Sequence, residues 1–253
     1  MRINDAHFHL DNSFSNINDQ IESLKHSRDK FQIDKFGFVY LTASKFSLED
    51  HASLLSIFPG SQLIAQINPL YFTEPKQEFQ RLIDLGAHSI KLHPRLDQFS
   101  LMDNKVLELM DTVERYNFSV YICSFWDGTW DRYGLKIEDY GRLADLFPKV
   151  KFSWAHFGGH KILDFMFMLR RRPNVWADIS LTQHYFFSGS VFQDLIYSIS
   201  SLRGDRVMFG SDNPESNYEF LSQLINEKFL TSLEPAVSDK LFSRNFDLFF
   251  SQK

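Results

Sequence analysis

The sequence predicts a (β/α)₈ barrel, in which eight parallel strands alternate with helices. Short apolar runs alternate with longer amphipathic runs along the chain, a pattern typical of βαβ units and a parallel sheet. Eight such units within 253 residues fit a closed barrel of about 250 residues better than an open sheet. Because no linker, low-complexity segment or short repeat is evident, we expect a single domain over residues 1–253.

The elements can be placed from the same pattern. The predicted strands are Ile3–His9, Gly37–Thr42, Gln62–Asn68, Ser89–His93, Ser119–Ser124, Val150–His156, Val175–Ser180 and Arg206–Ser211. The predicted helices are Ile17–Lys30, Leu48–Phe58, Pro75–Leu85, Leu101–Tyr116, Ile137–Phe147, Lys161–Arg171, Ser190–Ser200 and Asn217–Lys228. A last amphipathic run, Glu234–Phe250, predicts one additional C-terminal helix packed outside the barrel.

Charge and composition exclude several classes of partner. A net charge of −5 without a basic face argues against nucleic acid, and no apolar run reaches the roughly 20 residues of a membrane span. The single cysteine, Cys123, excludes an intramolecular disulfide and fits a reducing compartment. With no signal peptide evident, we expect a cytoplasmic protein that acts on a small-molecule substrate. The oligomeric state is left open, a homo-oligomer included.

Two histidines separated by one residue end the first predicted strand. Alternate residues of a strand point to the same side, so His7 and His9 can hold one divalent metal ion from a single rigid edge. Taken alone, the pair is equally compatible with surface histidines, because short motifs also occur by chance. Asp5 precedes the pair, and we expect it to support the histidines rather than to bind a metal itself.

Other chemically capable residues also fall at strand ends, where barrels of this kind carry their active sites. The fourth strand ends in Lys91 and His93, the sixth in His156, and Asp212 follows the eighth. Cys123 lies at the end of the fifth strand. Three further histidines lie in helix or loop sequence and are expected at the surface, namely His26, His51 and His88.

Four motifs, in this order at four strand ends, resemble the amidohydrolase superfamily: Asp5-Ala6-His7-Phe8-His9, Lys91-Leu92-His93-Pro94, Ala155-His156-Phe157-Gly158-Gly159 and Phe209-Gly210-Ser211-Asp212-Asn213-Pro214. Within it, the chain looks like the amidohydrolase-related branch, also called amidohydrolase 2. That branch includes metal-dependent hydrolases, decarboxylases and lactonases that act on carboxylated substrates. The resemblance extends to Val175–Ser180 and Lys240–Phe246, and so covers nearly the whole chain.

The resemblance implies roles for four of these residues. His7 and His9 would be metal ligands. Asp212 would contact the metal and take the proton of the attacking water. His156 would either bind a second metal or polarise the substrate. The opposing interpretations are a buried structural role for His156 and a helix-capping role for Asp212, which aspartate fills well.

The fourth strand supplies the expected substrate-binding residues. Lys91 and His93 are two residues apart and should both face the barrel mouth, and Arg95 follows them. In some superfamily members a lysine on this strand is carboxylated and bridges two metals, whereas in this branch it more often serves a substrate carboxylate. We therefore expect Lys91, His93 and Arg95 to bind an anionic group of the substrate.

The fifth strand departs from the family pattern. The family usually carries a metal-ligating histidine there, and Cys123 takes its place in this chain. A thiolate is a good zinc ligand, so Cys123 is a candidate fourth ligand beside His7, His9 and Asp212. A small, buried and inert cysteine is equally compatible with the sequence, and both readings stay open.

The loop after the fifth strand is rich in aromatic residues, namely Phe125, Trp126, Trp130 and Tyr133. These side chains fit a substrate lid and an outer aromatic cluster equally well.

The function expected from these residues is a metal-dependent hydrolase that acts on a small, carboxylate-bearing substrate through a metal-activated water. One divalent ion is expected, with Zn²⁺ favoured, and Asp212 and His156 are the expected catalytic residues. The same residues also fit a decarboxylase or a metal-independent lactonase of the same family. A degenerate barrel that binds a ligand without turnover is the non-enzymatic alternative.

Overall fold

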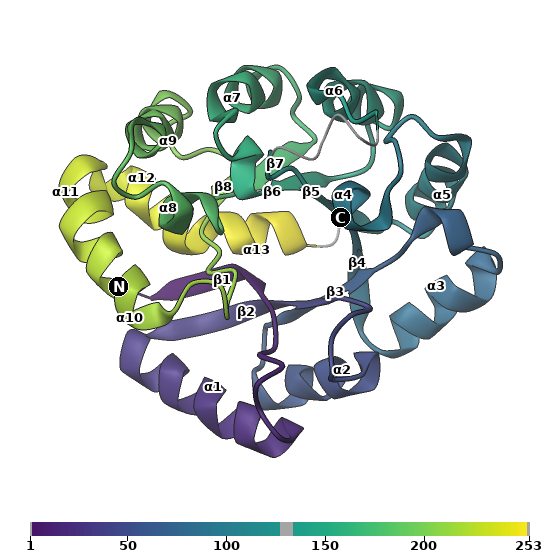
Figure 1. Cartoon of the computed structure of the whole chain (residues 1–253), viewed down its shortest axis with the longest axis horizontal. Helices are drawn as coiled ribbons and strands as arrows, with labels where there is room; N and C mark the ends of the chain where they lie inside the picture. Colours follow the sequence, from purple (N-terminus) through teal and green to yellow (C-terminus); the bar gives the residue numbers. More distant parts are fainter. Residues whose placement is uncertain (1, 127–133, 252–253) are drawn as a thin grey trace.

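Eight parallel strands form the centre of the protein in a computed structural model that describes residues 2–126 and 134–251. The strands follow one another in chain order and each pairs with the next, with the helices arranged around them (Figure 1). Their bounds are β1 (Ile3–Phe8), β2 (Ile33–Tyr40), β3 (Gln62–Gln66), β4 (Ala87–Leu92), β5 (Ser119–Cys123), β6 (Phe152–Ala155), β7 (Val175–Asp178) and β8 (Val207–Met208). The predicted (β/α)₈ barrel is confirmed, although β2 begins earlier than expected and β8 is only two residues long.

The short β8 is extended by single hydrogen bonds that bring the chain back to β1. The amide of Ala6 donates to the Phe209 carbonyl at 2.9 Å, and the amide of Asp212 donates to the His7 carbonyl at 2.8 Å. Farther along, the amide of His9 donates to the Asn213 carbonyl at 3.1 Å. The segment after β8 therefore lies beside the end of β1, which places Asp212 next to His7 and His9.

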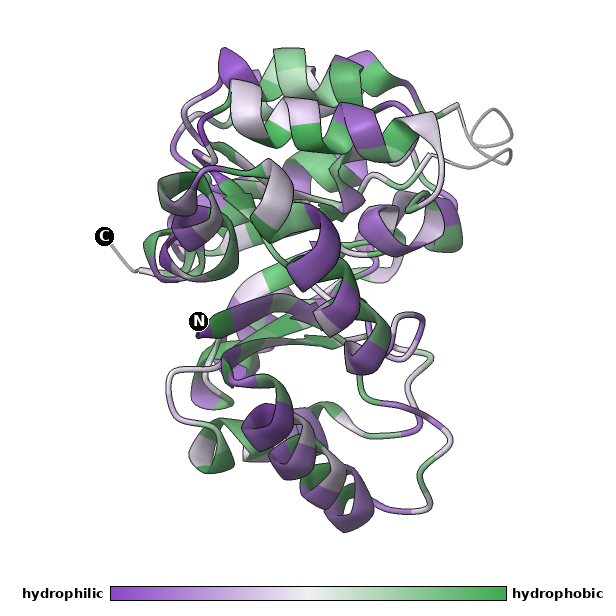
Figure 2. Cartoon of the chain, turned by 90° about the vertical axis from the view of Figure 1, so that its left-hand side faces the viewer, coloured by the Kyte–Doolittle hydropathy of each residue, from purple (hydrophilic) through white to green (hydrophobic). Residues whose placement is uncertain are grey.

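The eight predicted helices are all present and connect the strands. They are α1 (Ile17–Phe31), α2 (Leu48–Ile57), α3 (Pro75–Asp84), α5 (Asn104–Arg115), α6 (Ile137–Leu146), α7 (Ile162–Arg170), α9 (Ser190–Ser201) and α10 (Tyr218–Leu224). Hydrophilic and hydrophobic residues alternate along them (Figure 2), as expected for helices with one face on the barrel. Within the described residues, no helix combines the length and apolar composition that crossing a membrane requires.

Shorter elements add detail to the loops. Two short helices that the sequence did not predict lie after β4 and β7, namely α4 (Pro94–Asp97) and α8 (Thr182–Tyr185). The described residues also include the 3₁₀ turns η1 (Pro69–Tyr71) and η3 (His156–Gly158). Helix α10 continues through the π-helical η4 (Ile225–Phe229) into α11 (Leu230–Ser232). Because α4, α8 and η3 follow strand ends, they form part of the barrel mouth.

The sequence predicted that the C-terminal helix packs on the outside of the barrel. That prediction is wrong, because the helix lies across the N-terminal end of the barrel. It consists of α12 (Pro235–Asp239), the π-helical η5 (Lys240–Arg244) and α13 (Asn245–Phe250), and α13 crosses the middle of the ring (Figure 1). Phe246 and Phe249 belong to the same buried cluster as residues of the strands. Lys151, just before β6, donates hydrogen bonds to the Phe249 and Ser251 carbonyls at 3.0 and 2.9 Å. The helix thus closes the end of the barrel opposite the predicted site.

One histidine lies elsewhere than the sequence predicted. His51, expected at the surface, is buried on the inner face of α2 together with Leu48 and Leu54. Its Nδ1 lies 2.8 Å from the Ser47 carbonyl, and its ring meets the ring of Tyr40 edge-on. His51 therefore contributes to the packing between α2 and the barrel.

Candidate active site

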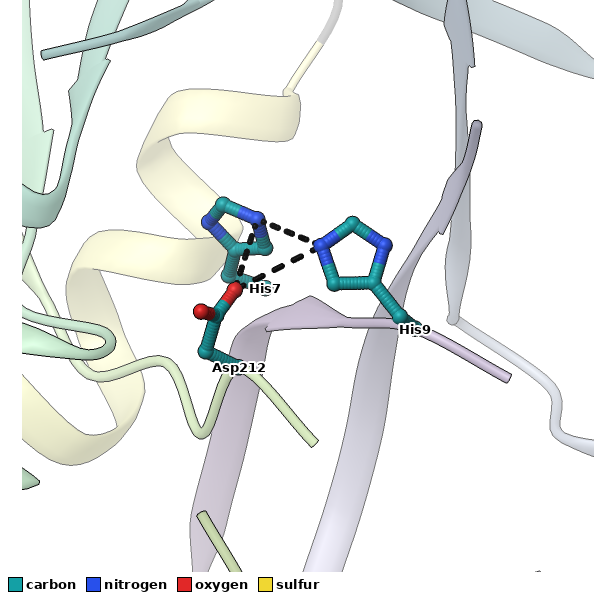
Figure 3. Close-up of side chains that lie close together, drawn as sticks. All are labelled: His7, His9 and Asp212. Carbon is teal, nitrogen blue, oxygen red and sulfur yellow. Dashed lines mark hydrogen bonds and ion pairs between the residues drawn. The ribbon is translucent and has the colours of Figure 1, made fainter. Parts of the chain in front are cut away.

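Three side chains from opposite ends of the sequence meet at the C-terminal end of the barrel. His7 Nε2 and His9 Nε2 lie 3.1 Å apart. Asp212 Oδ1 lies 3.3 Å from His7 Nε2 and 3.4 Å from His9 Nε2. The three side chains point toward one another (Figure 3). The sequence prediction that these residues converge agrees with this geometry.

The chemistry of this trio fits a divalent cation. His9 Nδ1 lies 3.1 Å from the Val39 carbonyl, which only accepts hydrogen bonds, so a neutral His9 ring carries its proton on Nδ1 and a lone pair on Nε2. His7 Nδ1 lies 3.2 Å from Asp178 Oδ2, which fixes its tautomer in the same way. Two nitrogen lone pairs and a carboxylate oxygen therefore face one another. Two ligands of a tetrahedral Zn²⁺ lie roughly 3.3 Å apart, close to the three separations found here.

Asp212 is held in a strained backbone conformation. Its φ is 59°, and His156 and Leu181 at neighbouring strand ends have φ values of 69° and 59°. Such left-handed values cost roughly 1–3 kcal/mol for a residue with a side chain and gather at functional sites. Asp212 does not cap the next helix, because the Asn217 side chain accepts from the Phe220 amide and caps α10. The helix-capping interpretation of Asp212 is therefore wrong.

Burial and neighbouring charges shift the pKa values of His7 and Asp212. Burial, together with the Lys91 ammonium, lowers the pKa of His7 to about 4, which favours a neutral ring. Burial alone would raise the pKa of Asp212, but His156 and His7 outweigh it and hold this pKa well below its usual range. A neutral imidazole and an ionised carboxylate are the forms that bind metals.

Asp5 supports this trio through the backbone, as expected. Its carboxylate accepts from the amides of His7 at 3.1 Å and Ser211 at 2.8 Å, and from the Tyr218 hydroxyl at 2.6 Å. Burial raises the pKa of Asp5 to about 6. The carboxylate thus ties the end of β1 to the segment that carries Asp212.

His156 lies beside the trio and contacts the end of β7. Its ring stacks on that of His7 with centroids 4.9 Å apart, and its Nδ1 lies 2.9 Å from Ser180 Oγ. Burial alone would lower the pKa of His156, but Asp212 and Cys123 outweigh it and raise this pKa. His156 is therefore placed to donate a proton or a hydrogen bond beside Asp212.

Cys123 is buried but does not join the trio. In residues 2–126 and 134–251, two groups of side chains could hold a metal, His7 with His9 and Asp212, and His7 with His156 and Asp178. Cys123 belongs to neither. Burial alone would raise the pKa of its thiol, but the neighbouring His93 and His156 outweigh it and lower this pKa. The geometry thus places Cys123 among the histidines of β4 and β6 and gives no support to a fourth ligand.

The expected substrate-binding residues line a cavity of about 510 Å³ that also contains the trio. Lys91 is buried, and its Nζ lies 3.3 Å from His7 Nε2. His93 follows β4 and caps α4 by accepting from the Leu96 amide, and Arg95 lies on α4. All three line the cavity, so basic side chains gather on its β4 side.

Aromatic side chains line another part of this cavity. Phe125 and Tyr185 are both lining residues, and their rings meet edge-on 5.6 Å apart. Phe186 stacks on Phe125. Of the predicted aromatic group, Trp130 and Tyr133 lie outside the described residues.

Two residues of the site were missed by the sequence reasoning. Asp178 ends β7, and its carboxylate contacts His7 and accepts from the amides of His156 and Ser180. Ser180 follows and contacts both histidine rings. The sequence did contain a signal for Asp178, because it is the acidic residue at the end of an apolar, buried strand. A buried charge without a partner is costly, so such a residue can be expected to contact a polar side chain of the site.

Comparisons with known proteins agree with this architecture. A family model described as amidohydrolase matches residues 5–245. No curated protein gives a significant match.

Several solved structures share the fold. A probable 2-pyrone-4,6-dicarboxylic acid hydrolase from Acinetobacter baumannii, with citric acid bound, is 15% identical, with a TM-score of 0.73 and 99% of each chain covered. An amidohydrolase from Burkholderia multivorans with bound zinc is 12% identical, with a TM-score of 0.72 and 100% of each chain covered. A 5-carboxyvanillate decarboxylase from Novosphingobium aromaticivorans, complexed with manganese, is 15% identical, with a TM-score of 0.62 over 94% of this chain and 84% of that chain. At such identities the likeness shows the fold alone.

Proposed function

Because the chain belongs to the amidohydrolase family, we propose that it is a metal-dependent hydrolase that acts on a small, carboxylate-bearing substrate. The observation that carries this proposal is the convergence of His7 Nε2, His9 Nε2 and Asp212 Oδ1 within 3.1–3.4 Å of one another. This donor set suits a divalent ion, with Zn²⁺ favoured because imidazole nitrogen and carboxylate oxygen are its usual ligands besides thiolate. A cation held there would act as a Lewis acid and lower the pKa of a nearby water to about 7.

We assign separate roles to Asp212 and to the residues around the three metal-binding side chains. Asp212 is the proposed base that orients the attacking water and takes its proton at a carboxylate oxygen. His156 presents Nε2 to the substrate, and in its protonated form, with a proton on each nitrogen, the ring would donate a hydrogen bond to the substrate oxygen on which charge develops. Asp178 keeps the His7 ring in place through Nδ1.

The lining of the cavity supports a small anionic substrate. Lys91, His93 and Arg95 place basic side chains on one side, while Phe125 and Tyr185 offer aromatic surface. A cavity of about 510 Å³ lies within the usual range for small-molecule sites, ~300–1,000 Å³. We therefore propose a carboxylate that binds at the β4 side, with an apolar or planar body that packs against the aromatic rings.

The experiment that tests this function combines metal control with a substrate panel. The purified protein is stripped with a chelator, reloaded with Zn²⁺ or Mn²⁺, and assayed with carboxylated lactones, amides and aromatic acids. The proposal expects hydrolysis of a lactone or amide by the loaded protein, and its loss after stripping. Release of CO₂ from an aromatic acid would replace the hydrolase assignment with a decarboxylase. Hydrolysis that survives stripping would favour the metal-independent lactonase.

A further inference from the structure

A single hydroxyl group, that of Ser180, lies within hydrogen-bond distance of both His7 and His156. Ser180 follows β7 and is fully buried. Its Oγ lies 3.0 Å from Nδ1 of His7 and 2.9 Å from Nδ1 of His156. The same oxygen donates its hydrogen to Asp178 Oδ1. One serine thus touches the proposed metal ligand, the proposed catalytic histidine and the carboxylate between them.

The hydrogen-bond partners determine where the ring protons are. The one hydrogen of the Ser180 hydroxyl goes to Asp178, so its oxygen can only accept from the two rings. Each Nδ1 has a second partner that accepts, because His7 Nδ1 faces Asp178 Oδ2 at 3.2 Å and His156 Nδ1 faces the Ser180 carbonyl at 3.1 Å. Both rings therefore carry a proton on Nδ1.

We propose that Ser180 is a positioning residue that holds His7 and His156 in the same tautomer and orientation. The consequence is that Nε2 of each ring is left for the chemistry of the cavity: the lone pair of His7 for a cation, and Nε2 of His156 for the substrate. This consequence rests on the proposed function, whereas the tautomers themselves do not. Ser180 contacts neither substrate nor metal, so its effect is exerted through the two rings.

The same geometry explains the second group of potential ligands, His7 with His156 and Asp178. Ser180 Oγ is within hydrogen-bond distance of all three side chains. The Ser180 hydroxyl already hydrogen-bonds to His7 Nδ1, His156 Nδ1 and Asp178 Oδ1. These atoms are therefore not available as ligands, and the group is a hydrogen-bonding centre rather than a second metal site. We thus assign His156 to the substrate and not to a second ion.

Replacement of Ser180 should separate positioning from simple packing. Ser180→Ala removes the shared acceptor, whereas Ser180→Thr keeps it. The matched control is Ser198→Ala, because Ser198 is equally buried on α9 and its Oγ has no hydrogen-bond partner among the described residues. Each variant is labelled with ¹⁵N-histidine, and NMR reports the proton position on each ring. Spectra of His7→Asn and His156→Asn assign the two rings.

The expected result has two parts. At a pH where both rings are neutral, both carry their proton on Nδ1 in wild type and Ser180→Thr. In Ser180→Ala, where His156 Nδ1 keeps only the residue-180 carbonyl as acceptor, a larger share of the His156 rings adopts the other tautomer. Zinc affinity, measured by competition with a chromogenic chelator, falls roughly 10–100-fold in Ser180→Ala, the usual cost of losing a group that orients a ligand. Ser180→Thr and Ser198→Ala keep the wild-type affinity.

Wild-type tautomers together with wild-type zinc affinity in Ser180→Ala would overturn the proposal. If that variant does not fold, as judged by its melting temperature, Ser180→Cys is judged by the same two readouts, since a thiol is only a weak acceptor. The NMR measurement on chelator-treated protein requires neither metal nor turnover. A tautomer change without any zinc binding in wild type would therefore uphold the positioning role of Ser180 and reject the metal-dependent function.

Discussion

The Nε2 atoms of His7 and His9 face each other at 3.1 Å, and each ring is anchored through its opposite nitrogen. When both rings are neutral, these partners leave neither Nε2 with a proton, so the two Nε2 atoms cannot hydrogen-bond to each other. The arrangement becomes favourable when a positive charge lies between them and Asp212. The alternation of a β-strand places the two histidines on one side, and the partners of Nδ1 set their tautomers.

Asp212→Asn tests the role of the carboxylate. The amide keeps the shape of the side chain but lacks the charge and the basicity that water activation requires, so turnover should fall by about 10²–10⁴-fold or more. The melting temperature should stay close to that of wild type, because Asn217 and not Asp212 caps the next helix. Steady-state kinetics and a thermal melt check both points, with Glu219→Gln, at an exposed position of α10, as control. Near wild-type turnover in Asp212→Asn would remove Asp212 from the mechanism.

Cys123→Ala tests whether the thiol is needed as a ligand. Because Cys123 is absent from both groups of potential ligands in the described residues, the metal content should equal that of wild type. Loss of buried contacts should cost about 1 kcal/mol of unfolding free energy. Elemental analysis and urea denaturation of the two proteins provide the comparison, and a clear loss of zinc in the variant would restore Cys123 as a ligand.

Phe249→Ala tests how the C-terminal helix closes the barrel. Phe249 is 1% exposed and its ring lies 5.4 Å from that of Tyr121 and 5.7 Å from that of Trp176. Its truncation should cost about 3–5 kcal/mol of unfolding free energy. Leu248→Ala, one residue earlier and 55% exposed, should change stability by less than about 0.5 kcal/mol. Equal effects of the two substitutions in urea denaturation would contradict this packing.

His51 should make stability depend on pH. Burial is the main cause that lowers its pKa from 6.5 to about 4, with His9 adding to it. Between these values the unfolded chain binds a proton that the folded protein excludes, so stability falls as the pH decreases from 6.5 toward 4. The total effect is on the order of 3 kcal/mol. Urea denaturation at several pH values in this range gives the unfolding free energy as a function of pH. This free energy should change less steeply with pH in His51→Gln than in wild type, and the exposed His160→Gln serves as control. Equal slopes would count against the buried, neutral His51.

The fold and the trio could be predicted because they depend on local rules. Alternation along a strand places His7 and His9 together, and the rule that active sites lie at C-terminal strand ends brings in Asp212. His51 was misplaced although it lies three residues from Leu48 and Leu54, a spacing that indicates one buried helix face.

Other features depend on contacts between distant segments. The position of the C-terminal helix follows from Phe249 packing into the barrel end and from Lys151 binding its last carbonyls, which periodicity does not reveal. The surroundings of Cys123 depend on how the ends of β4, β5 and β6 lie relative to one another. The role of Asp178 depends on its contact with His7, which lies far away in the sequence.

The central claim is that His7, His9 and Asp212 hold one divalent ion. The most direct measurement is an X-ray crystal structure of the zinc-treated protein with anomalous data collected at the zinc edge. The account predicts one anomalous peak per chain, enclosed by His7 Nε2, His9 Nε2 and Asp212 Oδ1. A structure without an anomalous peak at these three atoms, from protein that remains fully active after chelation, would contradict it.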